Sequence, residues 1–516
     1  MKKTDDLFQL IKSLSKSEKG YFKKFSYLYT IEGEKNYLKL FDAIEKQQEY
    51  DEKKLLKLFQ KEDFIKQFPR AKNYLYRLIL KCLRLYHSER TIELELKELL
   101  EYIEILYHKQ LYELYWKELK RAKKLAQENE NFLSSLEIIS WENKVLQEEH
   151  DMEGLKKLSD SASVDEQQIM KQYLNYREYE WIYLESFLKY YQKGSIRHEE
   201  EMLNYKSLMR KAVMKNEQRA LSTKAKIEFF QINAFYCFIN ANYIEAQQYI
   251  EQVIQLMEKS SFFKDNPKKH LQYLHNLSLL YLSIKKYYKL PLLIHKMKDI
   301  AVSFERIKLM AFSCHSNIEL LYLGFTGSFQ EGIEYSRKLE TEISKYKTKI
   351  DQKFLIQLYS QLAYLYMGAK RYSEALKWIN KVINDQYERI NSQLYSEAKI
   401  FNLIIHYEMK NMDLLEYIVR STYRFLYQRK RLYQFENCIM NFIRNWNKLG
   451  NSEQEKTNAF KKLKENLIKI SQNPHEKRAL EYFDYISWLE SKIEKRDFAE
   501  IVKEKAQLFL SSKVIE

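Results

Sequence analysis

Apolar positions recur at helical spacing on both sides of one short turn between Phe354 and Asp385. The apolar positions are Leu355, Leu358, Leu362 and Leu365 before the turn, and Leu376, Ile379 and Val382 after it. Spacing of three and four residues is typical of amphipathic helices. We expect Gly368 to loosen the backbone where the chain reverses, and small Ala363 and Ala375 to let the helices approach. The stretch therefore predicts an antiparallel helix pair.

The turn of this pair returns along the chain at a nearly constant interval. The four residues that begin at Tyr372 recur in similar form at Tyr243 and at Phe329, with weaker copies at Tyr287 and Met412. Successive turns lie 44, 42, 43 and 40 residues apart. Fainter turns keep roughly the same interval near Tyr112, Met152, Gly194, Gly450 and Asp497. Residues 91–516 are therefore predicted to form an all-α stack of antiparallel helix pairs.

Two prolines mark boundaries in this pattern. Pro267 follows Asn266 and is predicted to lie between pairs. Pro291 lies inside a predicted second helix, where it should kink the helix or delay its start, because proline removes a backbone N–H and clashes with the preceding turn.

Residues 1–90 share the repeat less clearly and are predicted to be a separate helical N-terminal module. Ser15 and Glu18 have the spacing of a capping box, in which each side chain bonds to the other residue's backbone N–H. Pro69 is predicted to begin a long helix that reaches about His87, since proline is tolerated in the first helical turn. The two predicted domains are residues 1–90 and residues 91–516.

The central pair resembles the tetratricopeptide repeat, a helix-turn-helix unit that stacks into a superhelix with a concave groove. The matching positions are Tyr359, Leu362, Ala363, Tyr366, Ala375 and Ile379. The interval is closer to that of HEAT-type pairs than to the 34 residues of the tetratricopeptide unit. The resemblance implies that the first helix of each pair lines the groove and binds a peptide or helical protein there. Its implied groove residues are Glu228, Gln231, Phe235, Gln272, His275, Asn317, Gln357, Ser360 and Tyr364.

Composition supports a helical, cytoplasmic protein. Only 9 glycines and 4 prolines occur in 516 residues, which leaves little turn chemistry for a sheet. No export signal or membrane-spanning run is visible, so we expect a cytoplasmic protein without membrane association. The four cysteines are far apart, which is typical of core residues in a reducing compartment and not of a disulfide framework or zinc site.

The net charge of +16 is concentrated in three windows, residues 66–90, 264–298 and 420–444. In the first window a helix would present one cationic face, made of Arg70, Arg77, Lys81 and Arg84. In the third window Arg420, Arg424, Arg429 and Arg431 alternate with tyrosines, a mixture that binds single-stranded nucleic acid. The competing interpretations are a solvated face, a site for an acidic protein and a nucleic-acid site.

No motif for catalysis, a metal or a cofactor is visible. We therefore expect a non-enzymatic scaffold or adaptor that binds a protein partner. One alternative is a nucleic-acid-binding or regulatory protein that uses the three basic windows. The other is an enzyme of unrecognised type, which would need a buried cluster of titratable groups.

Overall fold

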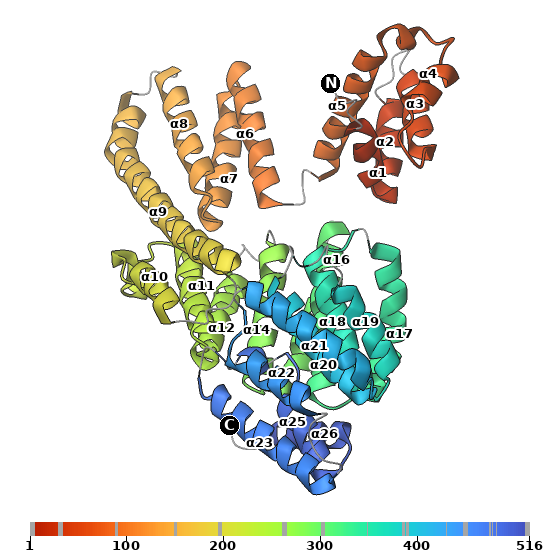
Figure 1. Cartoon of the computed structure of the whole chain (residues 1–516). Coiled ribbons are helices and arrows are strands. Elements are labelled where there is room, and N and C mark those ends of the chain that lie inside the picture. Colours follow the sequence, from red (N-terminus) through yellow and green to blue (C-terminus); the bar gives the residue numbers. More distant parts are fainter. Residues whose placement is uncertain are drawn as a thin grey trace. The chain divides into compact units, whose positions relative to one another are not determined.

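The computed structural model describes residues 6–28, 35–87, 91–148, 152–193, 199–260, 266–300, 305–347, 349–383, 388, 392–429, 431–446, 452–473, 476, 478–480 and 482–510. Every regular element in these ranges is an α-helix or a short 3-10 helix, and no strand occurs among them (Figure 1). Helices that follow one another along the chain pack together as antiparallel neighbours. The predicted fold class, an all-α stack of helix pairs with a helical N-terminal module, is confirmed.

The chain divides into two compact units, residues 1–166 and residues 167–516. The division falls inside one long helix, α9 (Met152–Lys193). The first unit contains two hydrophobic cores, which lie on either side of the domain boundary predicted at residue 90. Its other helices are α1 (Asp6–Ser13), α2 (Lys16–Leu28), α3 (Lys35–Lys46), α4 (Glu52–Leu58), the 3-10 helix η1 (Asp63–Gln67), α5 (Phe68–His87), α6 (Ile92–His108), α7 (Tyr112–Glu128) and α8 (Phe132–Glu148).

The predicted capping box closes the start of α2. The Ser15 N–H donates to Glu18 Oε2 at 2.7 Å, and the Glu18 N–H donates to Ser15 Oγ at 3.3 Å. Glu18 also meets His87 Nε2 at 2.8 Å, which ties the start of α2 to the end of α5. The long helix predicted from Pro69 is α5, and it begins one residue earlier.

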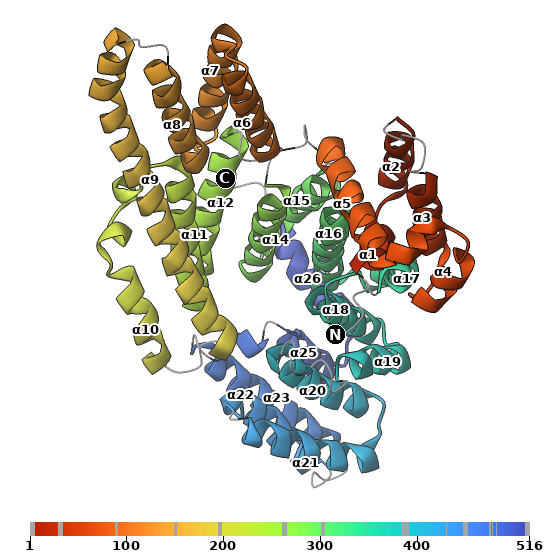
Figure 2. The same cartoon turned by 90° about the horizontal axis from the view of Figure 1, so that it is seen from above.

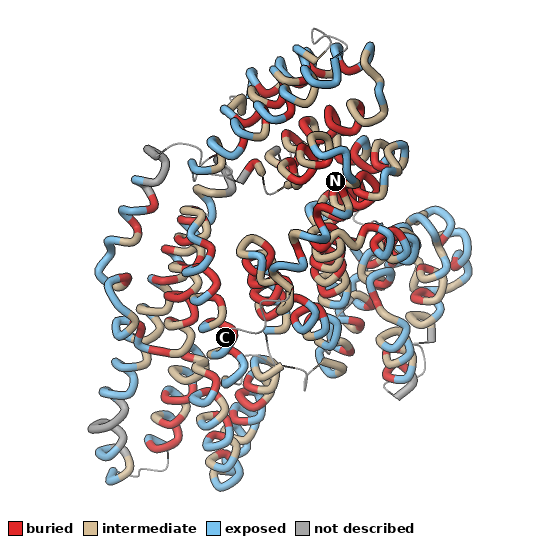
Figure 3. The backbone as a smooth tube through the Cα atoms, turned by 90° about the horizontal axis from the view of Figure 1, so that it is seen from below, coloured by how far each residue is buried: buried red, intermediate tan, exposed pale blue. Residues whose placement is uncertain are grey.

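The second unit consists of helix pairs after the end of α9. Its elements are α10 (Glu199–Met209), η3 (Ala212–Met214), η4 (Glu217–Arg219), α11 (Thr223–Ile239), α12 (Tyr243–Lys259), α14 (Pro267–Ser283), η5 (Tyr287–Lys289), α15 (Leu290–Asp299), α16 (Glu305–Phe325), α17 (Phe329–Tyr346), α18 (Gln352–Gly368), α19 (Tyr372–Val382), α20 (Ser392–Glu408), α21 (Met412–Gln428), α22 (Gln434–Trp446), α23 (Glu453–Ser471), η7 (Arg478–Leu480), α25 (Tyr485–Glu494) and α26 (Phe498–Leu510). Buried residues gather where neighbouring helices face one another (Figure 3).

The second helix of each central pair begins where the repeat predicts a turn. α12, α17, α19 and α21 start at Tyr243, Phe329, Tyr372 and Met412, and η5 starts at Tyr287. The fainter turns near Tyr112, Met152 and Asp497 are confirmed by α7, α9 and α26, whereas Gly194 and Gly450 lie outside the described residues. The interval found in the sequence therefore holds for the central pairs, whereas one continuous helix, α9, spans a stretch where the repeat predicts two helices.

The five central turns, which precede Tyr243, Tyr287, Phe329, Tyr372 and Met412, are closed by the same backbone cap. After α18, the Lys370 N–H donates to the Met367 carbonyl at 3.0 Å and the Arg371 N–H to the Tyr366 carbonyl at 2.9 Å. This pair of bonds is the Schellman motif, which needs a residue in the left-handed conformation. The residues with positive φ at the five central turns are Ala241, Lys285, Gly327, Lys370 and Lys410. Four of these five are not glycine, so the cap is specified by the packed helices more than by residue type.

The prediction that Gly368 reverses the chain is wrong, because that role belongs to Lys370 with φ of 61°. Gly368 is the last residue of α18 and lies against Phe329 at the start of α17. A Cβ at this position would come within 2.2 Å of the Phe329 ring. Gly368 therefore provides space for an aromatic ring.

Both prolines have the predicted effects. Pro267 is the first residue of α14 and lies between two pairs. Pro291 lies in the first turn of α15, and the 3-10 helix η5 occupies the place where that helix would otherwise begin. The start of the second helix is thus delayed, because proline is accommodated in the first turn.

Candidate functional site

Four of the residues predicted to line a groove, Glu228, Gln231, His275 and Asn317, make hydrogen bonds between successive first helices. Lys269 Nζ of α14 donates to Glu228 Oε1 of α11 at 2.9 Å, and the Tyr273 hydroxyl of α14 donates to Gln231 Oε1. His275 Nε2 of α14 donates to Asn317 Oδ1 of α16 at 3.1 Å. The partners are 41 or 42 residues apart, one repeat interval, so these side chains form a ladder along the stack.

Burial and neighbouring charges shift the pKa values of the ionisable side chains in and beside this ladder. Burial lowers the pKa of His275, which favours its neutral form. Burial also lowers the pKa of Lys269, but the adjacent Glu228 carboxylate outweighs this effect and leaves the pKa raised. Cys314 of α16 is fully buried, and its thiol pKa is raised to about 12 by loss of solvent. A thiol with this pKa is not a nucleophile at neutral pH.

The remaining groove predictions fall in different environments. The Phe235 ring of α11 is half-buried and packs on Tyr183 and Tyr190 of α9, with ring centroids 6.0 and 5.5 Å apart. Gln357 of α18 is half-buried and Gln272 of α14 is exposed. Gln272 is therefore the most accessible of the predicted groove residues.

The chain's own C-terminal segment, residues 478–480 and 482–510, covers Ser360 and Tyr364 of α18. Ser360 hydrogen-bonds to the Tyr482 hydroxyl. The Tyr364 ring packs on Phe483 at 5.5 Å and on Phe329 at 5.7 Å, and it is 3% exposed. The structure therefore places Tyr364 in the core and not on an open surface. Burial raises its pKa well above the usual value for tyrosine.

This segment contacts first helices and also the start of a second helix. Phe483 packs on Phe401 of α20 at 4.9 Å, and Phe509 of α26 packs on Tyr287 of η5 at 6.4 Å. The Trp488 indole N–H donates to Glu408 of α20 at 2.7 Å. Figure 2 shows α25 and α26 beside the first helices α16, α18 and α20. On α18 and α20, part of the face that the resemblance assigns to a partner is here covered by the same chain.

An exposed apolar stripe runs along α9 on the side opposite to its buried face. Met170, Leu174, Trp181, Leu184 and Leu188 are between 41% and 63% exposed. Arg177 completes the stripe and lies over the Trp181 ring at 5.4 Å. The six positions follow steps of four, three, four, three and four, the heptad spacing of a helix that packs against another helix. Buried Tyr179, Ile182 and Ser186 occupy the other face.

Some of the cations in the two later basic windows have acidic partners, among them three of the eight lysines in residues 264–298. In residues 264–298, Lys269 pairs with Glu228, Lys296 with Glu258 and Lys298 with Glu319, the last two at 2.9 and 2.8 Å. These ion pairs weaken the interpretation of that window as an anion-binding surface.

The third window, residues 420–444, is neutralised in part. Arg420 pairs with Glu416 and Arg429 with Glu388. Arg431 is half-buried, and Arg424 is exposed. The exposed rings of Tyr423 and Tyr427 stack on each other with centroids 6.2 Å apart.

The first basic window differs because its cationic face on α5 is exposed. Arg70, Arg77, Lys81 and Arg84 are all exposed, as the helical spacing predicts. Arg84 pairs with Glu101 of α6 at 3.1 Å. Neither Arg77 nor Lys81 makes an ion pair with any residue that the structure describes. Two free cations therefore lie one helical turn apart.

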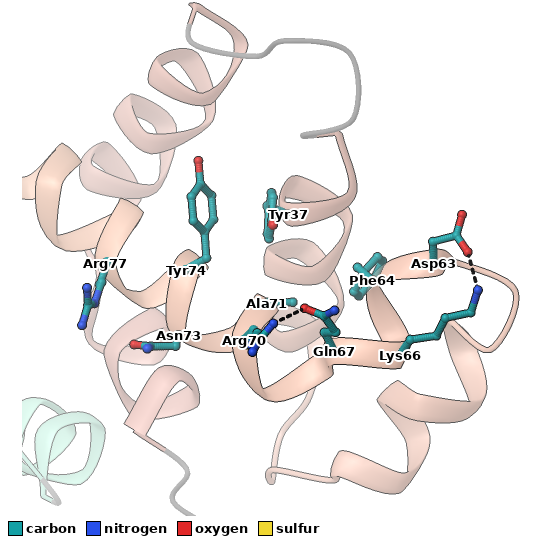
Figure 4. A pocket seen from close by; sticks show the side chains of 10 residues that line it. All are labelled: Tyr37, Asp63, Phe64, Lys66, Gln67, Arg70, Ala71, Asn73, Tyr74 and Arg77. Atoms are coloured by element: carbon teal, nitrogen blue, oxygen red, sulfur yellow. Dashed lines mark hydrogen bonds and ion pairs between the residues drawn. The ribbon is translucent and has the colours of Figure 1, made fainter.

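A pocket of about 720 Å³ opens beside this face (Figure 4). Its walls come from α3, η1 and the first half of α5, and they are Tyr37, Asp63, Phe64, Lys66, Gln67, Arg70, Ala71, Asn73, Tyr74 and Arg77. The Tyr37 and Tyr74 rings lie side by side with centroids 4.5 Å apart. Two internal contacts cross the lining, Lys66 Nζ to Asp63 Oδ1 at 3.0 Å and Arg70 Nη1 to Gln67 Oε1 at 2.9 Å.

Sequence reasoning found the two arginines of this pocket and missed its aromatic wall. Tyr74 lies between Arg70 and Arg77 on one helix face, so its position could have been predicted from helical spacing. Tyr37 lies on α3, and only the packing of α3 against α5 brings it to Tyr74.

No group of three or more potential metal ligands occurs among the residues that the structure describes. No described helix is both long and apolar enough to cross a membrane. Compared with known protein families, curated proteins and solved structures, the chain matches none of them.

Proposed function

We propose that the protein is a tetratricopeptide-like scaffold that binds an amphipathic helix of a partner protein along α9. The observation that carries the proposal is the exposed heptad stripe of Met170, Leu174, Trp181, Leu184 and Leu188. Helices recognise one another through side chains at this spacing, and apolar residues left in water favour association when they are covered.

The stripe specifies what the partner should look like. A facing helix would need apolar residues at the same alternating steps of three and four. Arg177 in the middle of the stripe favours an acidic or aromatic residue opposite it, although Glu180 already accepts a hydrogen bond from its guanidinium. Trp181 is 58% exposed and is the natural anchor, since tryptophan and arginine are enriched among residues that dominate binding energy.

The free energy available from burying the stripe is large enough for a specific complex. Full burial of one large apolar side chain contributes about 1.5–3 kcal/mol, and these five are roughly half exposed, so each has about 1 kcal/mol still to gain. Together they supply on the order of 5 kcal/mol before the cost of association. Polar contacts at the flanking Glu178 and Glu185 would set the partner's orientation.

The chemistry of the described residues supports binding over catalysis. Burial raises the thiol pKa of Cys237 to about 12 and of Cys82 to about 11, so both favour the unreactive thiol form. None of the four cysteines is in a disulfide, which supports a reducing compartment such as the cytoplasm.

The test is affinity purification of the full chain from its native cell, with and without nuclease, followed by a stripe variant. We expect Leu174→Glu with Leu184→Glu to lose the partner and to keep the wild-type melting curve, because both side chains are exposed. The matched control is Leu414→Glu on α21, whose side chain is 48% exposed. Retention of the same partner by the stripe variant would contradict the proposal. So would a purified chain that forms a dimer through this stripe, because the partner would then be a second copy.

A further inference from the structure

The pocket on α5 combines an aromatic wall with cations. The Tyr74 ring packs on Tyr37 at a tilt of 34°, and the Tyr74 side chain remains 42% exposed at the pocket's opening. Phe64 of η1 adds a third ring to the lining. An exposed ring beside a pocket of this size, about 720 Å³, offers a flat face to a planar ligand.

Positive charge exceeds negative charge in the lining around the Tyr74 ring. Lys66, Arg70 and Arg77 line the pocket against the single carboxylate of Asp63, which Lys66 neutralises at 3.0 Å. Arg70 is held by the Gln67 side chain and not by an acid. Arg77 has no ion-pair partner among the described residues. The positive charge therefore remains available to an anion.

Two amides complete the lining. Gln67 and Asn73 can each donate and accept hydrogen bonds, which suits the edge of a nucleobase. Lys81 continues the cationic face one turn beyond Arg77, about 6 Å along the helix axis. The surface thus offers stacking, edge contacts and a line of charge together.

We propose that this pocket binds single-stranded nucleic acid, with one base stacked on Tyr74 and the flanking phosphates held by Arg70, Arg77 and Lys81. The combination of aromatic side chains and cations is the one used for unpaired strands, since a ring can stack only on a base that is free of its complement. An acidic peptide would use the cations and the amides but has no planar base to stack on the exposed ring. This site lies on α5 and is separate from the α9 stripe.

The first test is fluorescence anisotropy of the full chain with a labelled 12-nucleotide single strand, about the length bound by small single-strand modules. Tyr74→Ala should weaken binding about five- to hundredfold, the range for loss of one stacked base. Tyr74→Phe keeps the ring and should bind like the wild type. Tyr74→Leu keeps an apolar contact with Tyr37 but removes the ring, so it serves if the alanine variant does not fold.

The second test separates phosphate contacts from general charge. Replacing Arg70 and Arg77 by alanine should weaken binding and flatten the dependence of log affinity on log salt by about 1.4, since each phosphate contact on a single strand contributes about 0.7. The matched control is Lys53→Ala with Lys57→Ala, which removes two exposed charges from α4 outside the pocket.

Several results would overturn the proposal. These are absence of binding by the wild-type chain, an unchanged affinity for Tyr74→Ala, or an equal loss in the α4 control. Equal binding of a 12-base-pair duplex or of poly-glutamate would also overturn it, because either would show recognition of charge alone. Far-UV circular dichroism and melting curves establish that each variant is folded.

Discussion

Because Gly368 leaves space for the Phe329 ring, we expect Gly368→Ala to destabilise the fold. A Cβ here would lie 2.2, 2.3 and 2.4 Å from three atoms of the Phe329 ring, whereas carbon atoms pack at about 3.5–4.0 Å. The ring cannot easily move, because Phe329 is 2% exposed and stacks on Phe498 at 5.6 Å. Overpacking of a core costs about 1–3 kcal/mol, and a clash this close belongs at or above the upper end.

Alanine also gains about 1 kcal/mol of helix propensity over glycine, which offsets part of this cost. We therefore expect Gly368→Ala to lower the free energy of unfolding by about 2 kcal/mol. The matched control is Gly20→Ala in α2, where a Cβ meets nothing within 4 Å. That variant keeps only the propensity gain and should be more stable by about 0.5–1 kcal/mol.

The assay is urea unfolding of the full chain followed by far-UV circular dichroism, with hydrogen exchange to assign the change to α17 and α18. Phe329→Leu should relieve the clash, so the double variant should be more stable than the two single effects predict by at least about 1 kcal/mol. A Gly368→Ala chain as stable as the wild type, or a double variant with purely additive effects, would refute the packing role.

Three further predictions concern stability. Lys410→Gly should raise the free energy of unfolding by about 0.5–1 kcal/mol in urea titrations, because glycine adopts the positive φ of the cap after α20 without a Cβ clash; a loss of stability would contradict the cap. Tyr364→Phe should be neutral or stabilising in the same assay, since the buried Tyr364 hydroxyl has no hydrogen-bond partner among the described residues; a loss above about 1 kcal/mol would reveal a partner. Burial, with a smaller effect of Lys298, lowers the pKa of His315 to about 4. His315 therefore binds a proton near pH 6.5 in the unfolded chain, but only near pH 4 in the folded chain. His315 should therefore lower stability as the pH drops from 6.5 towards 4, by about 2 kcal/mol at pH 5. His315→Gln should remove this share of the loss and leave the share of His270, whose pKa burial also lowers to about 4.

The repeat could be predicted because its signals are local. The apolar spacing and the similar residues at Tyr243, Phe329 and Tyr372 mark the start of each second helix, and the same helical physics acts at every copy. The capping box at Ser15 and the proline at Pro69 are local in the same sense, since their bonding partners lie within one turn.

What could not be predicted depends on residues far apart in the chain. Tyr364 is covered by Phe483, more than a hundred residues later in the chain. No local sequence pattern predicts that the C-terminal segment packs against α18. The role of Gly368 depends on Phe329 of the preceding pair. The groove assignment assumed an open inner face, whereas Glu228, Gln231, His275 and Asn317 bond between first helices.

The candidate binding surfaces could likewise be predicted only where they depend on local spacing. The exposure of Arg70 and Arg77 follows from helical spacing, but the aromatic wall needs the contact of Tyr37 with Tyr74. The α9 stripe has a heptad pattern in the sequence, yet its exposure could be recognised only once the opposite face, with Tyr179 and Ile182, was seen to be buried.

Hydrogen exchange of the Phe483→Ala variant tests whether the C-terminal segment covers the first helices α18 and α20. Phe483 is fully buried against Tyr364 and Phe401, so its loss should cost about 3–5 kcal/mol and open the helices that it covers. Amides of α18 and α20 should exchange at least tenfold faster than in the wild type, while those of α11 and α12, which belong to another core, should be unchanged. Unchanged exchange in α18 and α20, or an equal increase in α11 and α12, would contradict it.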